Sequence, residues 1–186
     1  MRKKTRKPYP DYWEWRESRT TKRQDELHYG DRIAATLRWE SVFSTLAHAQ
    51  TSAGAWTFDR PRILSRDVEV REAATDAVIA VVHFKWTGDA TLEFADGGHL
   101  DWAPTNFWQT QWAFFGPASG DDKERALIVF GDTSGFLEAR SAVSYRTSNL
   151  TAEESALLTT LGHYLMMLHR RDSAAVAASA ATVAAG

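Results

Sequence analysis

A stretch near the C-terminus constrains the fold more than any other part of the sequence, because it has the pattern of a helix without the charges of a surface helix. Residues 151–168 read TAEESALLTTLGHYLMML, with no charged residue between Glu154 and His169. The large apolar side chains fall on one broad face at about 100° per residue. They are Leu157, Leu158, Leu161, Tyr164, Leu165 and Leu168. The opposite face is small or weakly polar where a surface helix would carry Lys and Glu, so we predict that the chain encloses this helix on most sides.

The ends of this helix are marked by residues that suit helix termini. Thr151 and Glu154 have the spacing of a capping box, in which each side chain accepts a hydrogen bond from the other residue's backbone N–H. Acidic residues occupy the first turn, and the basic residues Arg170 and Arg171 follow the last apolar residue, as the helix dipole favours. The predicted helix therefore covers residues 151–171.

The sequence between Asp31 and Tyr145 has the pattern of β-strands. Apolar and polar residues alternate through residues 54–60, which places Trp56 and Phe58 on one face. Turn-forming residues such as Asp96-Gly97-Gly98 separate the strands. We predict about ten to twelve short strands joined largely by tight turns, which is typical of a barrel or a sandwich. The segments with strand character are 35–39, 43–51, 54–60, 62–64, 67–71, 78–86, 91–94, 99–102, 108–114, 126–130 and 136–145.

The dimensions of a helix and a barrel connect these two patterns. A helix with its side chains is about 10–12 Å across. This is too wide for an eight-stranded barrel filled by side chains, whereas a barrel of about twelve strands has room for it. Eighteen helical residues span about 27 Å, comparable to a strand of about eight residues. We therefore predict a mainly β fold: a closed antiparallel barrel of about twelve strands around a central hydrophobic C-terminal α-helix.

We predict one domain with a loose segment at each end. Residues 1–24 hold nine of the 22 Lys and Arg residues and three of the 24 acidic residues, so they form a basic N-terminal arm. The aromatic residues of the arm are expected to dock on the body of the protein: Tyr9, Tyr12, Trp13 and Trp15. The barrel with its helix covers residues 25–172. The Ala-rich residues 173–186 form a tail that we expect to fray.

The composition excludes several functional classes. The chain has no cysteine, which excludes disulfides, thiolate metal sites, thiol nucleophiles and S-palmitoyl anchors and fits a cytoplasmic location. The basic N-terminus has no apolar run behind it, so we expect no signal peptide. The uncharged part of the helix is about 13 residues long, below the roughly 20 needed to cross a bilayer, so we expect no transmembrane segment. We expect no binding of nucleic acid either.

Two groups of residues could hold a metal ion by residue type. His99 and Asp101 lie two apart on a predicted strand, hence on one outward face, but no third ligand accompanies them. Asp121, Asp122 and Glu124 lack the spaced oxygen ligands and the central Gly of a calcium loop. We therefore predict no metal site and no cofactor.

Two histidines lie among apolar neighbours and could titrate or coordinate a ligand. His83, between Val82 and Phe84, is interpreted as a hydrogen-bonded residue of a barrel face. His163 lies on the enclosed helix, and we expect it to hydrogen-bond a strand residue because a buried polar atom needs a partner. A proton- or ligand-responsive site is the alternative for His163. The sequence contains no nucleophile elbow, phosphate-binding loop or HExxH motif, so we predict no catalytic residues.

Five segments of the sequence carry a resemblance to a known family. They are ATLR at 35–38, GAWTFDR at 54–60, VIA at 78–80, DG at 96–97 and LLTTLGHYL at 157–165. In order and spacing, over residues 30–170, they resemble the tubby C-terminal-like superfamily, which includes tubby, phospholipid scramblases and the LURP-one-related proteins. The resemblance implies a barrel of about twelve strands around a hydrophobic helix. It also implies binding of phosphoinositide head groups by basic residues, as in tubby, whereas the cysteine-rich palmitoylated segment of scramblases has no counterpart here.

The sequence thus favours a non-catalytic tubby-like or LURP-one-like protein that contacts an anionic phospholipid membrane or a protein partner with its surface. Such a protein would be cytoplasmic and peripheral to the membrane. The candidate lipid-binding residues are the cations of the arm: Arg2, Lys3, Lys4, Arg6 and Lys7. One alternative is a lipocalin-like carrier, with the helix outside the barrel and a small apolar ligand in the lumen. Scramblase-like activity and an enzyme of unrecognised type are the others.

Overall fold

The computed structural model describes residues 13–61, 66–116, 126–132, 140–147 and 149–184, and their side chains up to residue 175. In these residues twelve β-strands are followed by one α-helix. The elements are β1 (Trp13–Glu17), β2 (Gln24–Tyr29), β3 (Arg32–Trp39), β4 (Ala47–Thr51), β5 (Ala55–Asp59), β6 (Val68–Glu72), β7 (Val78–Phe84), β8 (Ala90–Phe94), β9 (His99–Pro104), β10 (Gln111–Phe115), β11 (Ala126–Asp132), β12 (Arg140–Tyr145) and α1 (Ala152–Ala184).

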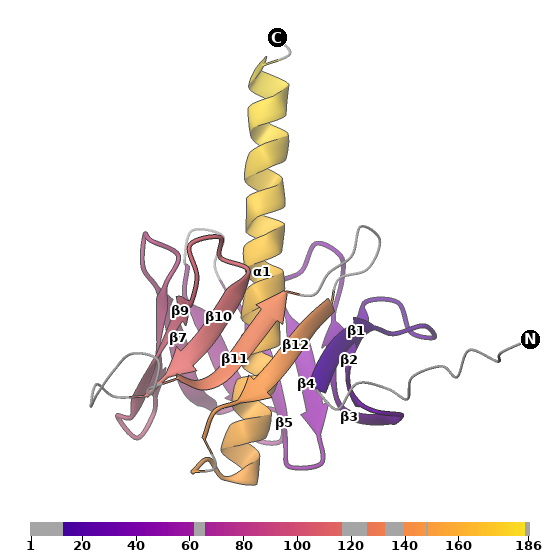
Figure 1. Ribbon diagram of the computed structural model, residues 1–186, viewed down its shortest axis with the longest axis vertical. Coiled ribbons are helices and arrows are strands. Elements are labelled where there is room, and N and C mark those ends of the chain that lie inside the picture. The colour runs from indigo at the N-terminus through magenta and orange to yellow at the C-terminus, as the bar shows by residue number, and fades with distance from the viewer. Residues whose placement is uncertain (1–12, 62–65, 117–125, 133–139, 148, 185–186) are drawn as a thin grey trace, which may run out of the picture.

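The strands form one closed antiparallel barrel. Each strand pairs with its neighbours in the sequence, and β1 pairs with β12 to close the sheet. The closing register places Trp13 opposite Val143 and Trp15 opposite Ser141. Figure 1 shows the barrel from the side, with α1 running through it. The predicted closed barrel around a C-terminal helix is confirmed.

The helix distinguishes the two ends of the barrel. It follows β12 and passes through the barrel to project from the opposite end (Figure 1). We call these ends the entry end and the exit end. Alternate connections of an antiparallel meander lie at the same end, so the exit end carries the connections after β1, β3, β5, β7 and β9. The described residues of these connections are 18–23, 40–46, 60–61, 66–67, 85–89 and 105–110.

The helix α1 occupies the lumen. Every residue from 157 to 166 is buried. Because ten residues make nearly three helical turns, this burial covers every side of the helix. Trp39 and Phe58 pack on Tyr164, with ring centroids 5.1 and 5.3 Å away. All six residues of the predicted helix core are buried: Leu157, Leu158, Leu161, Tyr164, Leu165 and Leu168.

The predicted capping box forms at the start of α1. The backbone N–H of Thr151 donates to Glu154 Oε2 over 2.7 Å, and the backbone N–H of Glu154 donates to Thr151 Oγ1 over 3.1 Å. The hydrogen bond from the Thr151 backbone lowers the pKa of the Glu154 carboxyl. A carboxyl group with a lowered pKa in the folded state stabilises the fold at neutral pH and loses this contribution as the pH falls through its folded pKa.

The predicted boundary between arm and barrel is wrong. Residues 13–24 do not belong to an arm outside the barrel, because β1 begins at Trp13 and β2 at Gln24. The aromatic ring of Trp15 is fully buried, and Leu27 is buried beside it. The charged residues around these two obscure the alternation of buried and exposed positions along β1 and β2. Residues 1–12 lie outside the described part of the chain.

The end of α1 and the start of β10 differ from the predicted boundaries. The described residues of the Ala-rich tail are helical, since α1 continues past residue 172 to Ala184. Alanine has the highest helix propensity, and no Gly or Pro interrupts this stretch before Gly186. The predicted strand 108–114 begins at Gln111 instead, because Asn106 organises a turn: its Oδ1 accepts the backbone N–H of Thr110 at 3.0 Å. The predicted strand 62–64 lies outside the described residues.

The backbone of the helix packs closely against the barrel at Gly162. A Cβ atom built on Gly162 would lie 2.2 Å from Cζ of Phe130, on β11. Carbon atoms in contact are separated by about 3.5–4.0 Å, so a side chain at this position displaces the ring. The absence of a side chain at residue 162 therefore allows Phe130 to pack directly against the helix backbone.

We expect Leu161→Asp to unfold the domain. Leu161 is 0% exposed, and an unpaired carboxylate in the lumen costs several kcal/mol, comparable to the total stability of a domain of this size. Ser173→Asp, at an exposed position on the same helix, is the matched control. Circular dichroism during heating measures both variants. A Leu161→Asp protein that melts like the parent would show that the lumen does not enclose this side chain.

We expect Gly162→Ala to destabilise the domain by about 1–3 kcal/mol, because the added methyl group overlaps the Phe130 ring. Phe130→Leu alone removes buried volume and is destabilising too. The double variant should be more stable than the sum of the two single effects predicts, since the smaller side chain makes room for the methyl group. Urea unfolding of the four proteins measures this coupling, and strict additivity would contradict it.

Candidate functional site

Among the described residues, a buried polar cluster in the lumen is centred on His163. Ser141 Oγ lies 3.0 Å from His163 Nδ1, and Asp25 Oδ2 lies 3.1 Å from Nε2. The indole of Trp15 stacks on the imidazole, with centroids 4.3 Å apart and planes 4° from parallel. His163 is 1% exposed. The expectation that His163 hydrogen-bonds a strand residue is confirmed, with partners on β2 and β12.

Both ring nitrogens of His163 have a hydrogen-bond partner on the barrel wall. A hydroxyl group can donate or accept, so Ser141 satisfies Nδ1 in either tautomer of the imidazole. Ser141 is fully buried, so no substrate carbonyl can reach its Oγ. The serine, histidine and aspartate therefore fix the rotation of α1 in the barrel rather than forming an accessible catalytic triad.

Two further side chains of α1, Tyr164 and Arg171, connect the helix to the exit end. The Tyr164 hydroxyl donates to the Thr45 carbonyl oxygen over 2.8 Å, and burial raises the pKa of this phenol, which keeps it protonated. Arg171 donates to the Ser44 carbonyl oxygen over 3.1 Å, and its guanidinium carbon lies 3.7 Å from the centroid of the Trp39 ring. Burial lowers the pKa of Arg171, which remains a cation at neutral pH. These contacts hold the helix where it leaves the barrel.

The histidines of the strands lie on the outer surface. His83 is half exposed, with Nδ1 3.3 Å from Asp67 Oδ1 and Nε2 3.7 Å from Glu93 Oε2. His99 is exposed, and Asp101 Oδ1 accepts a hydrogen bond from the Thr91 hydroxyl over 3.3 Å. Across the described ranges, no three His, Asp or Glu side chains are grouped so as to hold a metal ion. Asp121, Asp122 and Glu124 lie outside those ranges.

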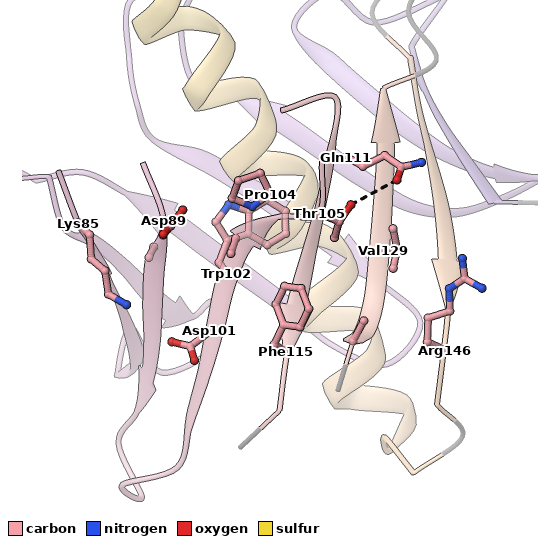
Figure 2. Close-up of a pocket in the computed structure, with 13 residues that line it drawn as sticks. Lys85, Asp89, Asp101, Trp102, Pro104, Thr105, Gln111, Phe115, Val129 and Arg146 are labelled. Carbon is pink, nitrogen blue, oxygen red and sulfur yellow. Dashed lines mark hydrogen bonds between the residues drawn. The ribbon is translucent and has the colours of Figure 1, made fainter. Parts of the chain in front are cut away.

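A groove of about 860 Å³ lies on the outer face of the sheet, over β8, β9, β10 and β11. Figure 2 shows it in front of the sheet, with α1 behind. Phe115 and Val129 supply an apolar surface, and the Thr105 hydroxyl donates to Gln111 Oε1 over 3.3 Å. Lys85 and Arg146 stand at opposite sides of the groove in this view. Its volume suits a small molecule, but its charged groups do not converge on one point as a catalytic site requires.

The sequence-predicted lipid-binding residues Arg2, Lys3, Lys4, Arg6 and Lys7 all lie outside the described residues. Asp25, Ser141 and Trp15 were not predicted as partners of His163. Asp25 and His163 are separated by 138 positions, and no local pattern links them. Within the described residues, no helix is both long and apolar enough to cross a membrane.

No protein-family model, curated protein or solved structure matches this chain. The resemblance to the tubby C-terminal-like superfamily therefore remains a prediction from the order and spacing of its segments.

We expect Ser141→Ala to destabilise the domain by about 1–3 kcal/mol, because it leaves His163 Nδ1 buried without its partner. Ser144→Ala, three residues further along the same strand and exposed, is the control and should be nearly neutral. Chemical unfolding measures both. Equal stability of the two variants would show that the hydroxyl of Ser141 contributes nothing to the placement of α1.

Proposed function

We propose that the protein is a non-catalytic, tubby-like module that binds an anionic phospholipid membrane with its outer surface. The observation that carries this proposal is the concentration of positive charge before the barrel begins. Residues 1–12 contain five cations and one acidic residue, in a chain whose net charge is −2. In this proposal the protein is cytoplasmic and associates with the membrane reversibly.

The occupied lumen supports a function on the exterior. A lipocalin-like carrier needs a cavity of several hundred Å³ inside the barrel, with the helix outside. Here α1 lies inside, and Leu161 at its centre is fully buried. A ligand or partner would therefore meet the outer face, the ends of the barrel or the arm.

The cations of the arm provide an electrostatic attraction whose sign and size suit reversible binding to an anionic membrane. A Lys or Arg near an anionic leaflet contributes about 1 kcal/mol, and the attraction declines over a Debye length of about 10 Å at roughly 0.1 M salt. Five such residues give binding that depends on anionic lipid and weakens with salt. Scramblase-like activity is less favoured, because this chain lacks the cysteines that resemblance would require.

We expect the protein to sediment with vesicles of phosphatidylcholine and phosphatidylserine, and not with phosphatidylcholine alone. Removing residues 1–8 should weaken this binding by roughly tenfold or more, because it deletes all five cations. Raising the salt from about 0.1 M to about 0.5 M should have a similar effect on the full chain.

Two variants of the full-length chain serve as controls for the truncation. Replacing Arg2, Lys3, Lys4, Arg6 and Lys7 with Gln should reproduce the loss, whereas exchanging each Lys for Arg and each Arg for Lys should not. If the full chain ignores anionic vesicles, membrane binding is the wrong function and a protein partner is favoured. If the truncated chain binds as well as the parent, the arm is not the contact.

A further inference from the structure

The most exposed large apolar side chains of the described residues are all at the exit end. Phe43 is 98% exposed, Trp86 is 91% and Phe107 is 89%, and Val42 and Trp108 lie in the same loops. The other exposed apolar residues are less exposed and belong to strand ends at the entry end: Tyr29, Ile33, Val78 and Tyr145. A soluble domain gains nothing from placing aromatic rings in water, so their gathering at one end requires an explanation.

The loops do not need these rings for their own structure. In the connection after β9, Asn106 Nδ2 donates to the Thr110 hydroxyl over 2.8 Å and Asn106 Oδ1 accepts the Thr110 backbone N–H. In the connection after β7, the turn is made by Gly88, whose φ is +94°. Neither Trp86 nor Trp108 takes part in these bonds. Trp86 contacts Arg66 and Trp108 contacts Phe107, both exposed residues themselves, and the rest of each indole faces solvent.

Basic residues accompany the aromatic rings. The guanidinium carbon of Arg66 lies 4.4 Å from the centroid of the Trp86 ring. The exposed cations of the described exit-end residues are Arg19, Lys22, Arg23, Arg66 and Lys85. The exposed acids there are Glu17, Glu40, Asp132 and Asp172, of which the last two form ion pairs with Arg170 and Arg60.

The entry end has the opposite charge balance. Its exposed acidic residues are Asp31, Asp76, Asp96, Glu153 and Glu154, while its exposed cations in the same described turns are Arg32 and Arg146. The end of the barrel that presents aromatic rings is thus also the end suited to an anionic surface.

We propose that the exit end is the surface that docks on the membrane, with Phe43, Trp86 and Trp108 inserted at the level of the lipid head groups and the surrounding cations on anionic lipid. This inference rests on the proposed membrane-binding function and assigns it a face. Aromatic rings are favoured at the membrane–water interface, where an apolar body meets a polar environment. The rings sit on separate loops, which a fluid bilayer accommodates one at a time, whereas a protein partner requires one contiguous patch.

The course of α1 agrees with this orientation. The helix leaves the barrel at the exit end and projects beyond the loops (Figure 1). Residues 173–184 contain no charged residue, and at about 1.5 Å per residue they extend about 18 Å. Docking of the exit end therefore carries residues 173–184 into the lipid ahead of the loops, and no charged side chain in this stretch opposes that entry.

The triple variant Phe43→Ser, Trp86→Ser, Trp108→Ser tests the assignment in the sedimentation assay with phosphatidylcholine–phosphatidylserine vesicles. We expect roughly a tenfold or greater loss of affinity, with an unchanged melting temperature because the three side chains are exposed. The matched control is Ile33→Ser, Val78→Ser, which removes exposed apolar side chains at the entry end and should bind like the parent.

The outcomes separate this inference from the function on which it rests. If the parent binds and the triple variant binds equally well, another face docks and the assignment fails, while membrane binding stands. If the control loses affinity as much as the triple variant, exposed apolar side chains contribute to binding wherever they lie, and the exit end is not the docking surface. If the parent does not bind anionic vesicles at all, both proposals fail together.

Discussion

Burial of α1 on every side is the constraint on which the rest of the structure depends. A surface helix needs one apolar stripe, and the remaining side chains can be charged. A helix inside a barrel has no solvent-facing side, so each of its polar atoms requires a partner within the protein. His163 hydrogen-bonds Asp25 and Ser141. The Tyr164 hydroxyl donates to the carbonyl oxygen of Thr45. The Thr160 hydroxyl donates to the carbonyl oxygens of Ala156 and Leu157 within the helix. The partners on the barrel belong to β12, β2 and the connection before β4, which lie on one side of the closed sheet, and they set the rotation of the helix in the lumen.

The fold could be predicted because its two strongest signals are local. The uncharged run before His169 excludes a surface helix. Strands such as β5 and β7 can be recognised from the alternation of residues that are adjacent in the sequence. β1 and β2 could not be recognised in the same way. At the centres of these two strands, only Trp15 and Leu27 are both apolar and buried. The charged residues around them give the segment the composition of a solvated arm. β1 pairs with β12, the last strand in the sequence, and β2 pairs with β1 and β3, so part of their strand structure depends on contacts that closure of the barrel provides.

The candidate sites were predictable to different degrees. His163 could be identified as buried and hydrogen-bonded, but its partners could not be named, because Asp25 is brought to it only by closure of the barrel. Trp108 was assigned to a strand, where alternation with Trp112 would turn it inward. The Asn106 side chain ends that regularity and leaves the indole in solvent. The gathering of aromatic rings at one end is visible only when loops distant in the sequence are placed together by the topology.

Because α1 follows all twelve strands in the chain, the strands are synthesised before the helix that fills their lumen. At about 5–20 residues per second, they emerge over roughly ten seconds or more before α1 does. Until then the inward rings of Trp102, Phe114 and Phe130 have no helix to cover them. A nascent chain of this topology therefore exposes apolar surface until α1 has been synthesised, and such surface favours aggregation or chaperone binding in that interval.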